Sequence, residues 1–410
     1  MNIIYNIGIY LAQVVLPIVA LFSGKIKQGV IGRSNSFSIL KNALDNSDKT
    51  LWYHCASLGE YEQGLPVFKE LRPLYPNHKI ILSFFSPSGY EIRKNTDIAD
   101  VVVYLPLDTP QNAKRFLDLV NPELTLFIKY DIWPNFLLEL KKRNHRAILI
   151  SALFRKDQSY FKFYGGFMRQ ALFAFEHIFV QDINTQKLLK SINYNKTTLT
   201  GDTRFDRVFS QLSQNNELAF IEQFKNNQLC LVAGSTWPED EALLIDYINH
   251  TNYNTKFIIA PHNIKSSQIE KLKKSLTKQT VLFSEKEHKN LNEYDVFIID
   301  TIGLLTKIYK YADIAYVGGA MGTTGLHNTL EPAVFGVPII IGTHYNKFPE
   351  ASQMILEGGM VSISDTVNLT ETLNYFIKNP LLIQKSGNQN FNYIKKNTGA
   401  VIQIVDYLRI

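Results

Sequence analysis

Short apolar runs alternate with longer stretches of mixed polarity along most of this chain. In the first half, runs without internal polar alternation cover residues 51–56, 79–84, 101–105, 124–129, 147–151 and 177–181. A continuous apolar run of this length is typical of a strand that is covered on both faces of a sheet. Helix-like patterns lie between the runs, at residues 63–74, 111–120, 133–144 and 160–175. This alternation predicts a doubly wound α/β domain.

The same rhythm begins again after a change of composition. Residues 210–228 are rich in Gln and Asn and contain neither Gly nor Pro. Apolar runs then return at residues 229–233, 256–260, 296–299, 314–317 and 337–341. We therefore predict two Rossmann-like α/β domains that face each other across a cleft, with ligands bound beyond the carboxyl ends of the strands. Their expected bounds are 36–207 and 228–410, with a linker at 208–227 and a last helix able to pack back on the first domain.

The N-terminal segment, residues 1–35, has a different pattern. No charged residue occurs from position 3 to position 22, and the next charged residues are all basic: Lys25, Lys27 and Arg33. Basic residues that follow the apolar run are not typical of a signal peptide. Asn6, Gln13 and Pro17 interrupt this apolar stretch. The stretch has about 20 residues, which is just enough for a helix to cross a bilayer. We predict that this segment associates with a membrane, either spanning it or lying in its interface, with its basic end on the cytoplasmic side. An amphipathic helix packed on the first domain is the alternative.

Composition narrows the class of protein. The 410 residues are 45% hydrophobic and 20% charged, which is typical of a globular protein. Two cysteines are too few for a disulfide framework or a cysteine-ligated zinc site and favour a reducing compartment. The 43 basic and 37 acidic residues give a net charge of +6, which suits a phosphate or an anionic membrane but is too diluted for a nucleic-acid binder. The chain contains no Asp-x-Asp, His-Glu-x-x-His or Cys-x-x-Cys motif, so we predict neither a metal nor a cofactor.

The candidate catalytic residues of the first half come directly after the predicted strand at 51–56. Ser57 and Gly59 belong to the predicted turn, and Glu60 lies near the start of the next helix. A carboxylate at a strand's carboxyl end could act as a general base, or it could simply stabilise the helix dipole. Ser86 follows the next strand, where it could bind the same ligand or cap a helix.

The candidate ligand-binding segment of the second half is a glycine-rich loop that follows the predicted strand at 314–317. The sequence from Gly318 to Gly325 has four glycines in eight residues, without the spacing of a Walker or dinucleotide motif. Backbone N–H groups of such a loop can approach a phosphate closely. Asn328 follows the loop, and Glu331, in the next helix, could accept two ribose hydroxyls.

Other polar residues follow neighbouring strands. Ser235 and Thr236 could contact phosphate or cap a helix, and His262, after Pro261, could bind a phosphate or a base edge. Arg204 lies where the two halves join, where it could meet an anionic substrate or form an interdomain salt bridge.

In their order along the chain, these segments resemble the 3-deoxy-D-manno-octulosonic acid (Kdo) transferases of lipopolysaccharide synthesis, which have the two-domain GT-B architecture. The motifs that carry the resemblance are Ser57-Leu58-Gly59-Glu60, Tyr104-Leu105-Pro106-Leu107-Asp108, Trp133-Pro134-Asn135, Thr200-Gly201-Asp202-Thr203-Arg204-Phe205-Asp206, Gly234-Ser235-Thr236, Gly318-Gly319 and His327-Asn328-Thr329-Leu330-Glu331. The resemblance covers nearly the whole chain, including an apolar N-terminus that in this family associates with the inner membrane.

The resemblance implies an inverting, metal-independent transfer of Kdo from CMP-Kdo to a lipid A precursor, at the cytoplasmic face of the inner membrane. It implies that Glu60 is the general base. The donor-binding residues that it implies are Ser235, Thr236, Pro261, His262, Gly319, Asn328 and Glu331. The acceptor-binding residues are Ser57, Gly59, Ser86, Asp131 and Arg204.

The chain departs from the family pattern at two places. Many members have Glu-Thr-Glu where this chain has Lys129-Tyr130-Asp131, and many have Pro-Arg-His where it has Pro261-His262-Asn263. Asp131 can keep part of the role of the missing acids, whereas Lys129 cannot. Two alternatives stay open: a GT-B glycosyltransferase or epimerase that uses a UDP-sugar, and a non-catalytic nucleotide-binding membrane scaffold. The sequence leaves open the number of Kdo units transferred, the phosphorylation of the acceptor and the oligomeric state.

Overall fold

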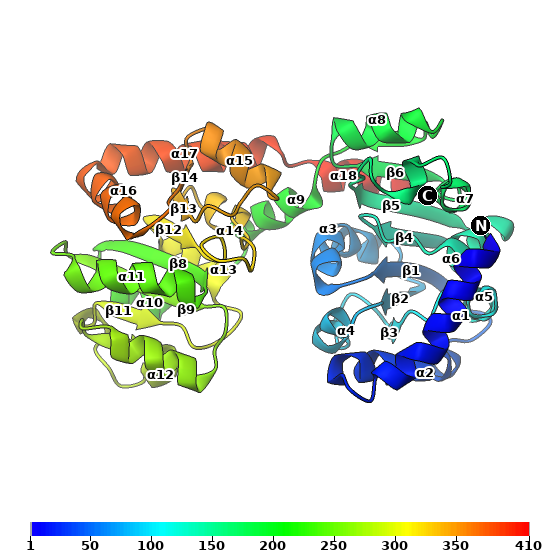
Figure 1. The fold of residues 1–410 in the computed structure, drawn as a ribbon, viewed down its shortest axis with the longest axis horizontal. Helices are drawn as coiled ribbons and strands as arrows, with labels where there is room; N and C mark the ends of the chain where they lie inside the picture. The colour runs from blue at the N-terminus through cyan, green and yellow to red at the C-terminus, as the bar shows by residue number, and fades with distance from the viewer. Residues whose placement is uncertain (1, 410) are drawn as a thin grey trace. The chain divides into compact units, whose positions relative to one another are not determined.

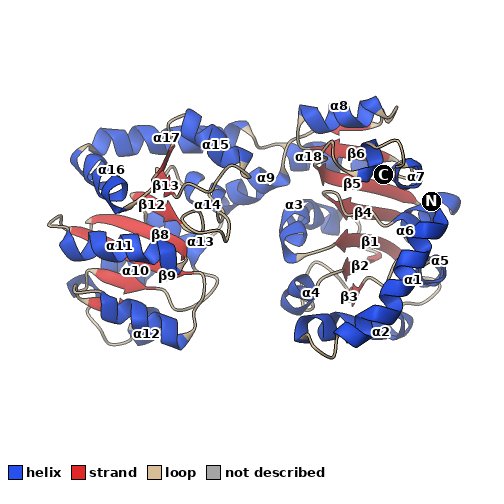
Figure 2. Cartoon of the chain, in the orientation of Figure 1, coloured by secondary structure: helices blue, strands red, loops and turns tan. Residues whose placement is uncertain are grey.

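The structure is a computed structural model that describes residues 2–409, and it divides into two compact α/β units (Figure 1). Unit 1 comprises Met1–Arg207 and Thr398–Ile410, and unit 2 comprises Val208–Asn397. Each unit contains a seven-stranded sheet in which every strand pair is parallel. Helices flank both faces of each sheet (Figure 2). The predicted doubly wound α/β class is therefore confirmed.

The sheet of unit 1 has the strand order β3-β2-β1-β4-β5-β6-β7. Its strands are β1 Lys49–Cys55, β2 His78–Phe84, β3 Val101–Tyr104, β4 Leu124–Ile128, β5 Arg146–Ala152, β6 His177–Val180 and β7 Thr197–Leu199. Its helices are α1 Asn2–Val19, α2 Gly24–Ala43, α3 Leu58–Leu74, α4 Pro87–Arg93, α5 Pro110–Val120, α6 Pro134–Lys142, α7 Gly166–Leu172, α8 Ile183–Ser191 and α18 Ala400–Leu408. Helix α9, Thr203–Ser210, carries the chain into unit 2.

The sheet of unit 2 has the strand order β10-β11-β9-β8-β12-β13-β14. Its strands are β8 Leu229–Thr236, β9 Thr255–Pro261, β10 Thr280–Leu282, β11 Val296–Ile298, β12 Ile314–Val317, β13 Ile339–Ile341 and β14 Met360–Ser362. Its helices are α10 Ala219–Lys225, α11 Pro238–His250, α12 Ser266–Ser275, α13 Leu305–Ile308, α14 Leu330–Ala333, α15 Pro349–Leu356, α16 Thr366–Lys378 and α17 Pro380–Lys396. In both sheets the loops that follow the central strands carry the candidate site residues.

The apolar runs form strands because both of their faces are buried. In β1, Trp52 packs into the hydrophobic cluster on one face of the sheet, whereas Leu51 and Tyr53 pack into the cluster on the other face, and all three are fully buried. A strand in this position has no solvent face, so its sequence does not alternate between polar and apolar residues.

One predicted helix is shorter in the structure than the sequence pattern indicated. The stretch 160–175 forms a 3₁₀ turn, Ser159–Phe161, followed by the short helix α7. Gly165 precedes α7 and Gly166 is its first residue, and glycine is a poor helix former because its backbone is conformationally free.

Helix α1 lies along unit 1 and bonds to it through polar side chains. The Tyr5 hydroxyl donates to Asp108 Oδ2 at 2.7 Å, Asn135 Nδ2 donates to Asn6 Oδ1 at 2.9 Å, and Tyr10 bonds to Gln111. Asp108 is fully buried and also accepts the backbone N–H groups of Asn135 and Phe136, so it ties α1 to the start of α6.

The other side of α1 is apolar and exposed. Its exposed residues include Ile3, Ile4, Ile7, Leu11, Val14, Val15 and Ile18. Among residues 2–409, α1 is the one helix long and apolar enough to cross a membrane, with a mean hydropathy of 1.6 and no buried residue.

Candidate active site

Glu60 lies in the first turn of α3, directly after the carboxyl end of β1, and only 8% of it is exposed. Its carboxylate accepts the backbone N–H of Ala56. Burial, with a smaller contribution from the nearby Asp131 carboxylate, raises the pKa of Glu60 to about 7, against the opposing effects of His54, the Ala56 N–H and Lys129. A carboxyl group with a pKa near neutrality can take a proton from a hydroxyl group and later release it.

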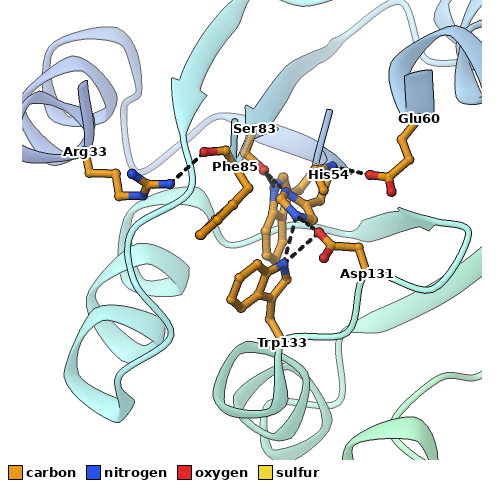
Figure 3. A network of polar contacts seen from close by, with 9 residues as sticks. Arg33, His54, Glu60, Ser83, Phe85, Asp131 and Trp133 are labelled. Atoms are coloured by element: carbon orange, nitrogen blue, oxygen red, sulfur yellow. Dashed lines mark hydrogen bonds and ion pairs between the residues drawn. The ribbon is translucent and has the colours of Figure 1, made fainter. Parts of the chain in front are cut away.

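Asp131 follows β4 and reaches toward the same turn (Figure 3). Its Oδ2 accepts the indole N–H of Trp133 at 2.8 Å and lies 2.5 Å from Nε2 of His54, a fully buried residue. Lys129, between β4 and Asp131, has a left-handed backbone with φ of 68°. This conformation is uncommon for a residue with a side chain and turns the chain sharply at the end of the strand.

Other predicted acceptor residues lie around the β1–α3 turn. The Ser86 N–H donates to Ala56 O at 2.8 Å, which joins the β2–α4 turn to the turn that holds Ser57. At Gly59, an added Cβ would meet only Ser57 Oγ, at 3.9 Å, so packing does not require a glycine there. The lack of a side chain leaves the start of α3 open to a ligand.

Arg204 is connected to α3 through Asp202. Its Nε is 2.7 Å from Asp202 Oδ2, and Asp202 Oδ1 accepts the side-chain amide of Gln63 at 2.9 Å. Gln63 lies on α3, one turn after Glu60, so the ion pair of Arg204 with Asp202 is a contact within unit 1.

The glycine-rich loop of unit 2 is held by a buried carboxylate that the sequence did not indicate. Asp240, in the first turn of α11, accepts the N–H groups of Gly319 and Trp237 at 2.8 and 2.9 Å and the hydroxyl of Tyr316 at 2.7 Å. An acidic residue three positions after the residue that precedes a helix is typical of a capping box, which is the signal that could have revealed it. Burial raises the pKa of Asp240.

Three aromatic rings pack together beside this loop. Trp237 stacks on His262 with centroids 4.6 Å apart, and His262 lies 4.5 Å from His327. Trp237 Nε1 donates to His327 Nε2 at 2.9 Å, so that nitrogen carries no proton. Burial, aided by His262, lowers the pKa of His327 to about 4 and keeps its ring neutral.

The remaining residues predicted to bind the sugar-nucleotide donor lie at the start of α14 and at the end of β8. Asn328 Nδ2 donates to Glu331 Oε1 at 3.0 Å, at the start of α14, which has only four residues. Ser235 and Thr236 end β8, where Ser235 has a φ of 54° and the Thr236 hydroxyl donates to Glu241 at 3.1 Å.

A pocket of about 250 Å³ lies between α11 and α12. Thr236 and Pro261 contribute to its lining, and the other donor candidates lie outside it. Within the described part of the chain, no group of three or more His, Cys, Asp or Glu residues could hold a metal ion.

The chain is similar in sequence to a known family of transferases. Residues 32–207 match the family model described as 3-deoxy-D-manno-octulosonic-acid transferase (kdotransferase). The 3-deoxy-D-manno-octulosonic acid transferase of Haemophilus influenzae is 28% identical over 90% of this chain and 88% of its own length. The enzyme of the same name from Chlamydophila psittaci is 26% identical over 84% of this chain and 81% of its own.

Solved structures show the same fold. The UDP-GlcNAc 2-epimerase of Neisseria meningitidis, bound to UDP-GlcNAc, has a TM-score of 0.61 and 15% identity over 88% of this chain and 99% of its own. MurG of Acinetobacter baumannii has a TM-score of 0.55 and 12% identity over 88% of this chain and 99% of its own. The predicted GT-B-like fold is therefore confirmed.

Proposed function

We propose that this chain, which belongs to the 3-deoxy-D-manno-octulosonic acid (Kdo) transferase family, moves Kdo from CMP-Kdo to a sugar hydroxyl of a lipid A precursor. The observation that carries the proposal is the buried carboxylate of Glu60, directly after β1, with a pKa near neutrality. Unit 1, which holds Glu60, contains all of the residues that match the family model.

In the proposed reaction, Glu60 takes the proton of the acceptor hydroxyl as that oxygen attacks the anomeric carbon of Kdo. The bond between this carbon and the phosphate oxygen of CMP breaks, and CMP leaves with the electron pair. Attack from the face opposite the leaving group inverts the configuration of the anomeric carbon. Because CMP is already a good leaving group, the protein accelerates the reaction mainly by base catalysis and by positioning the two substrates.

Unit 2 would bind the donor. Backbone N–H groups of the glycine-rich loop, Gly319 among them, can bind the phosphate, and the hydroxyl groups of Ser235 and Thr236 lie at the end of the neighbouring strand. Glu331 can accept ribose hydroxyls, with Asn328 orienting its carboxylate. His262 would contribute a ring already fixed by Trp237 in place of the family's arginine.

Thermal unfolding with CMP or UDP tests the identity of the donor. A nucleotide at about 100 times its Kd stabilises the protein that binds it by about 2.7 kcal/mol. We expect CMP to raise the Tm by several degrees and UDP at the same concentration to leave it unchanged. Protection by UDP instead of CMP would favour an enzyme that uses a UDP-sugar.

We also propose that α1 lies in the interface of the inner membrane, on its cytoplasmic side, rather than crossing it. A spanning position would remove Tyr5 and Asn6 from their partners Asp108 and Asn135, whereas an in-plane position keeps both hydrogen bonds. It also gives the exposed apolar side of α1 a lipid environment, next to the basic residues Lys25 and Lys27.

Sedimentation with anionic lipid vesicles tests this placement. Ile4→Asp puts a charge on the exposed side of α1, where the side chain is 73% exposed, and we expect it to weaken vesicle binding at least about tenfold. Ile302→Asp changes an isoleucine of unit 2 that is 81% exposed and should leave binding unchanged. Equal binding by the two variants would contradict the proposal.

A further inference from the structure

His54 is a polar residue inside an otherwise apolar strand. It lies in β1 between Tyr53 and Cys55, and all three are fully buried. Its ring makes a hydrogen bond at each nitrogen: Nδ1 lies 2.8 Å from Ser83 Oγ, and Nε2 lies 2.5 Å from Asp131 Oδ2 (Figure 3). A buried imidazole that is bonded at both nitrogens has a fixed orientation.

The partners of His54 determine which nitrogen carries the proton. The carboxylate of Asp131 can only accept a hydrogen bond, so Nε2 must donate. Ser83 Oγ accepts the indole N–H of Trp52 at 2.8 Å, and its own hydroxyl hydrogen can donate to Nδ1, 2.8 Å away. With the proton on Nε2, His54 donates to Asp131 Oδ2. The indole N–H of Trp133 lies 3.0 Å from Nε2 and 2.8 Å from Asp131 Oδ2, so it donates to the carboxylate oxygen.

The two oxygens of Asp131 differ as a result. Oδ2 accepts from both His54 and Trp133, whereas none of residues 2–409 donates to Oδ1. The side chain is 18% exposed, so Oδ1 can accept a hydrogen bond from a ligand. Trp133 is itself fixed, because its ring packs on that of Phe85 with centroids 4.7 Å apart.

We propose that His54 is a positioning residue for glycosyl transfer: it holds Asp131 so that Oδ1 accepts a hydrogen bond from an acceptor sugar hydroxyl beside the one that Glu60 deprotonates. This inference rests on the proposed function. It gives the two carboxylates different tasks, since Asp131 is fixed by two N–H donors and orients the acceptor, while Glu60 moves the proton.

Two substitutions of His54 that differ only in reach test this role. In His54→Gln the amide nitrogen can take the place of Nε2 and donate to Asp131, whereas in His54→Asn it reaches only as far as Ser83. A shift of about 1 Å in a positioning group costs about 10²-fold in rate. We expect His54→Asn to raise the acceptor KM at least about tenfold and to lower kcat about 10²-fold, and His54→Gln to stay within about fivefold of the wild type. CMP should protect both variants from unfolding as it protects the wild type.

A loss that is equal in the two variants, or an unchanged acceptor KM, would overturn the positioning role. A wild type that transfers no Kdo would instead overturn the proposed function, and the inference with it.

Asp131→Asn provides a second test that does not depend on the folding of the His54 variants. Asn keeps the shape of the side chain and an oxygen that can accept a hydrogen bond, but it removes the negative charge near Glu60. The other titratable groups that act on Glu60, His54 and Lys129, are unchanged. We expect a raised acceptor KM and an acidic limb of the pH–rate profile that moves to lower pH, because the neighbouring negative charge no longer opposes ionisation of Glu60. An acidic limb and an acceptor KM that both match the wild type would overturn the inference.

Discussion

Replacing Glu60 with glutamine is expected to lower the rate of Kdo transfer about 10³-fold and to leave CMP binding intact. Glutamine keeps the size of the side chain and an oxygen that can accept the Ala56 N–H, but it cannot take a proton. Loss of a general base typically costs 10²- to 10⁴-fold in rate. The measurement is kcat with saturating CMP-Kdo, alongside the CMP-dependent rise in Tm.

The same variant should be more stable than the wild type at high pH. The pKa of Glu60 is raised in the folded state, so its carboxyl group lowers stability as the pH rises from about 4.5 through about 7. A shift of this size corresponds to at most about 3 kcal/mol, because one pKa unit is about 1.36 kcal/mol. We expect Glu60→Gln to gain up to that amount at pH 8 and nothing at pH 4.

Glu70→Gln is the matched control for both measurements. Glu70 lies on the same helix, α3, but it is exposed, so the substitution should change neither transfer nor stability. Full transfer activity in Glu60→Gln would exclude Glu60 as the base.

Replacing Gly319 with alanine is expected to have the second largest effect. Gly319 has a φ of 96°, and an added Cβ would lie 2.1 Å from the carbonyl oxygen of Gly325 across the loop. The left-handed backbone costs about 1–2 kcal/mol for alanine, and overpacking adds about 1–3 kcal/mol. The loop must therefore move, and its N–H bond to Asp240 must break. We expect a loss of stability of about 3 kcal/mol and the loss of protection by CMP.

Gly303→Ala separates the clash from the backbone strain. Gly303 has a φ of 89°, but an added Cβ there would meet no atom within 4 Å. We expect this variant to lose only about 1–2 kcal/mol and to keep its response to CMP. If CMP protects Gly319→Ala as well as Gly303→Ala, the loop does not bind the phosphate.

Most of the sheet was predictable because burial on both faces leaves a simple pattern. The strands that the pattern missed are β7, β10 and β14, which have three residues each and lie at the edges of their sheets. Each of these edge strands contains a Thr or Ser, so none of them is a continuous apolar run, whereas the equally short β11 and β13 are apolar throughout and fully buried.

The site was less predictable because its support comes from contacts between distant residues. Glu60 could be found from its place after a strand, but the bond between His54 and Asp131 joins residues 77 positions apart. Asp108 shows the same limit, since its partner Tyr5 lies 103 positions away, in the apolar segment for which we predicted membrane association or packing on the first domain. Pairs of this kind appear only when the register of the sheet is known.

Mass spectrometry of the lipid product detects transfer of Kdo itself. Wild-type protein, CMP-Kdo and a tetra-acylated lipid A precursor are incubated together, and the mass of the lipid is measured. We predict that the lipid gains the mass of at least one Kdo residue as CMP is released. A lipid whose mass does not change, with protein that binds CMP tightly, would exclude Kdo transfer and favour a nucleotide-binding membrane scaffold.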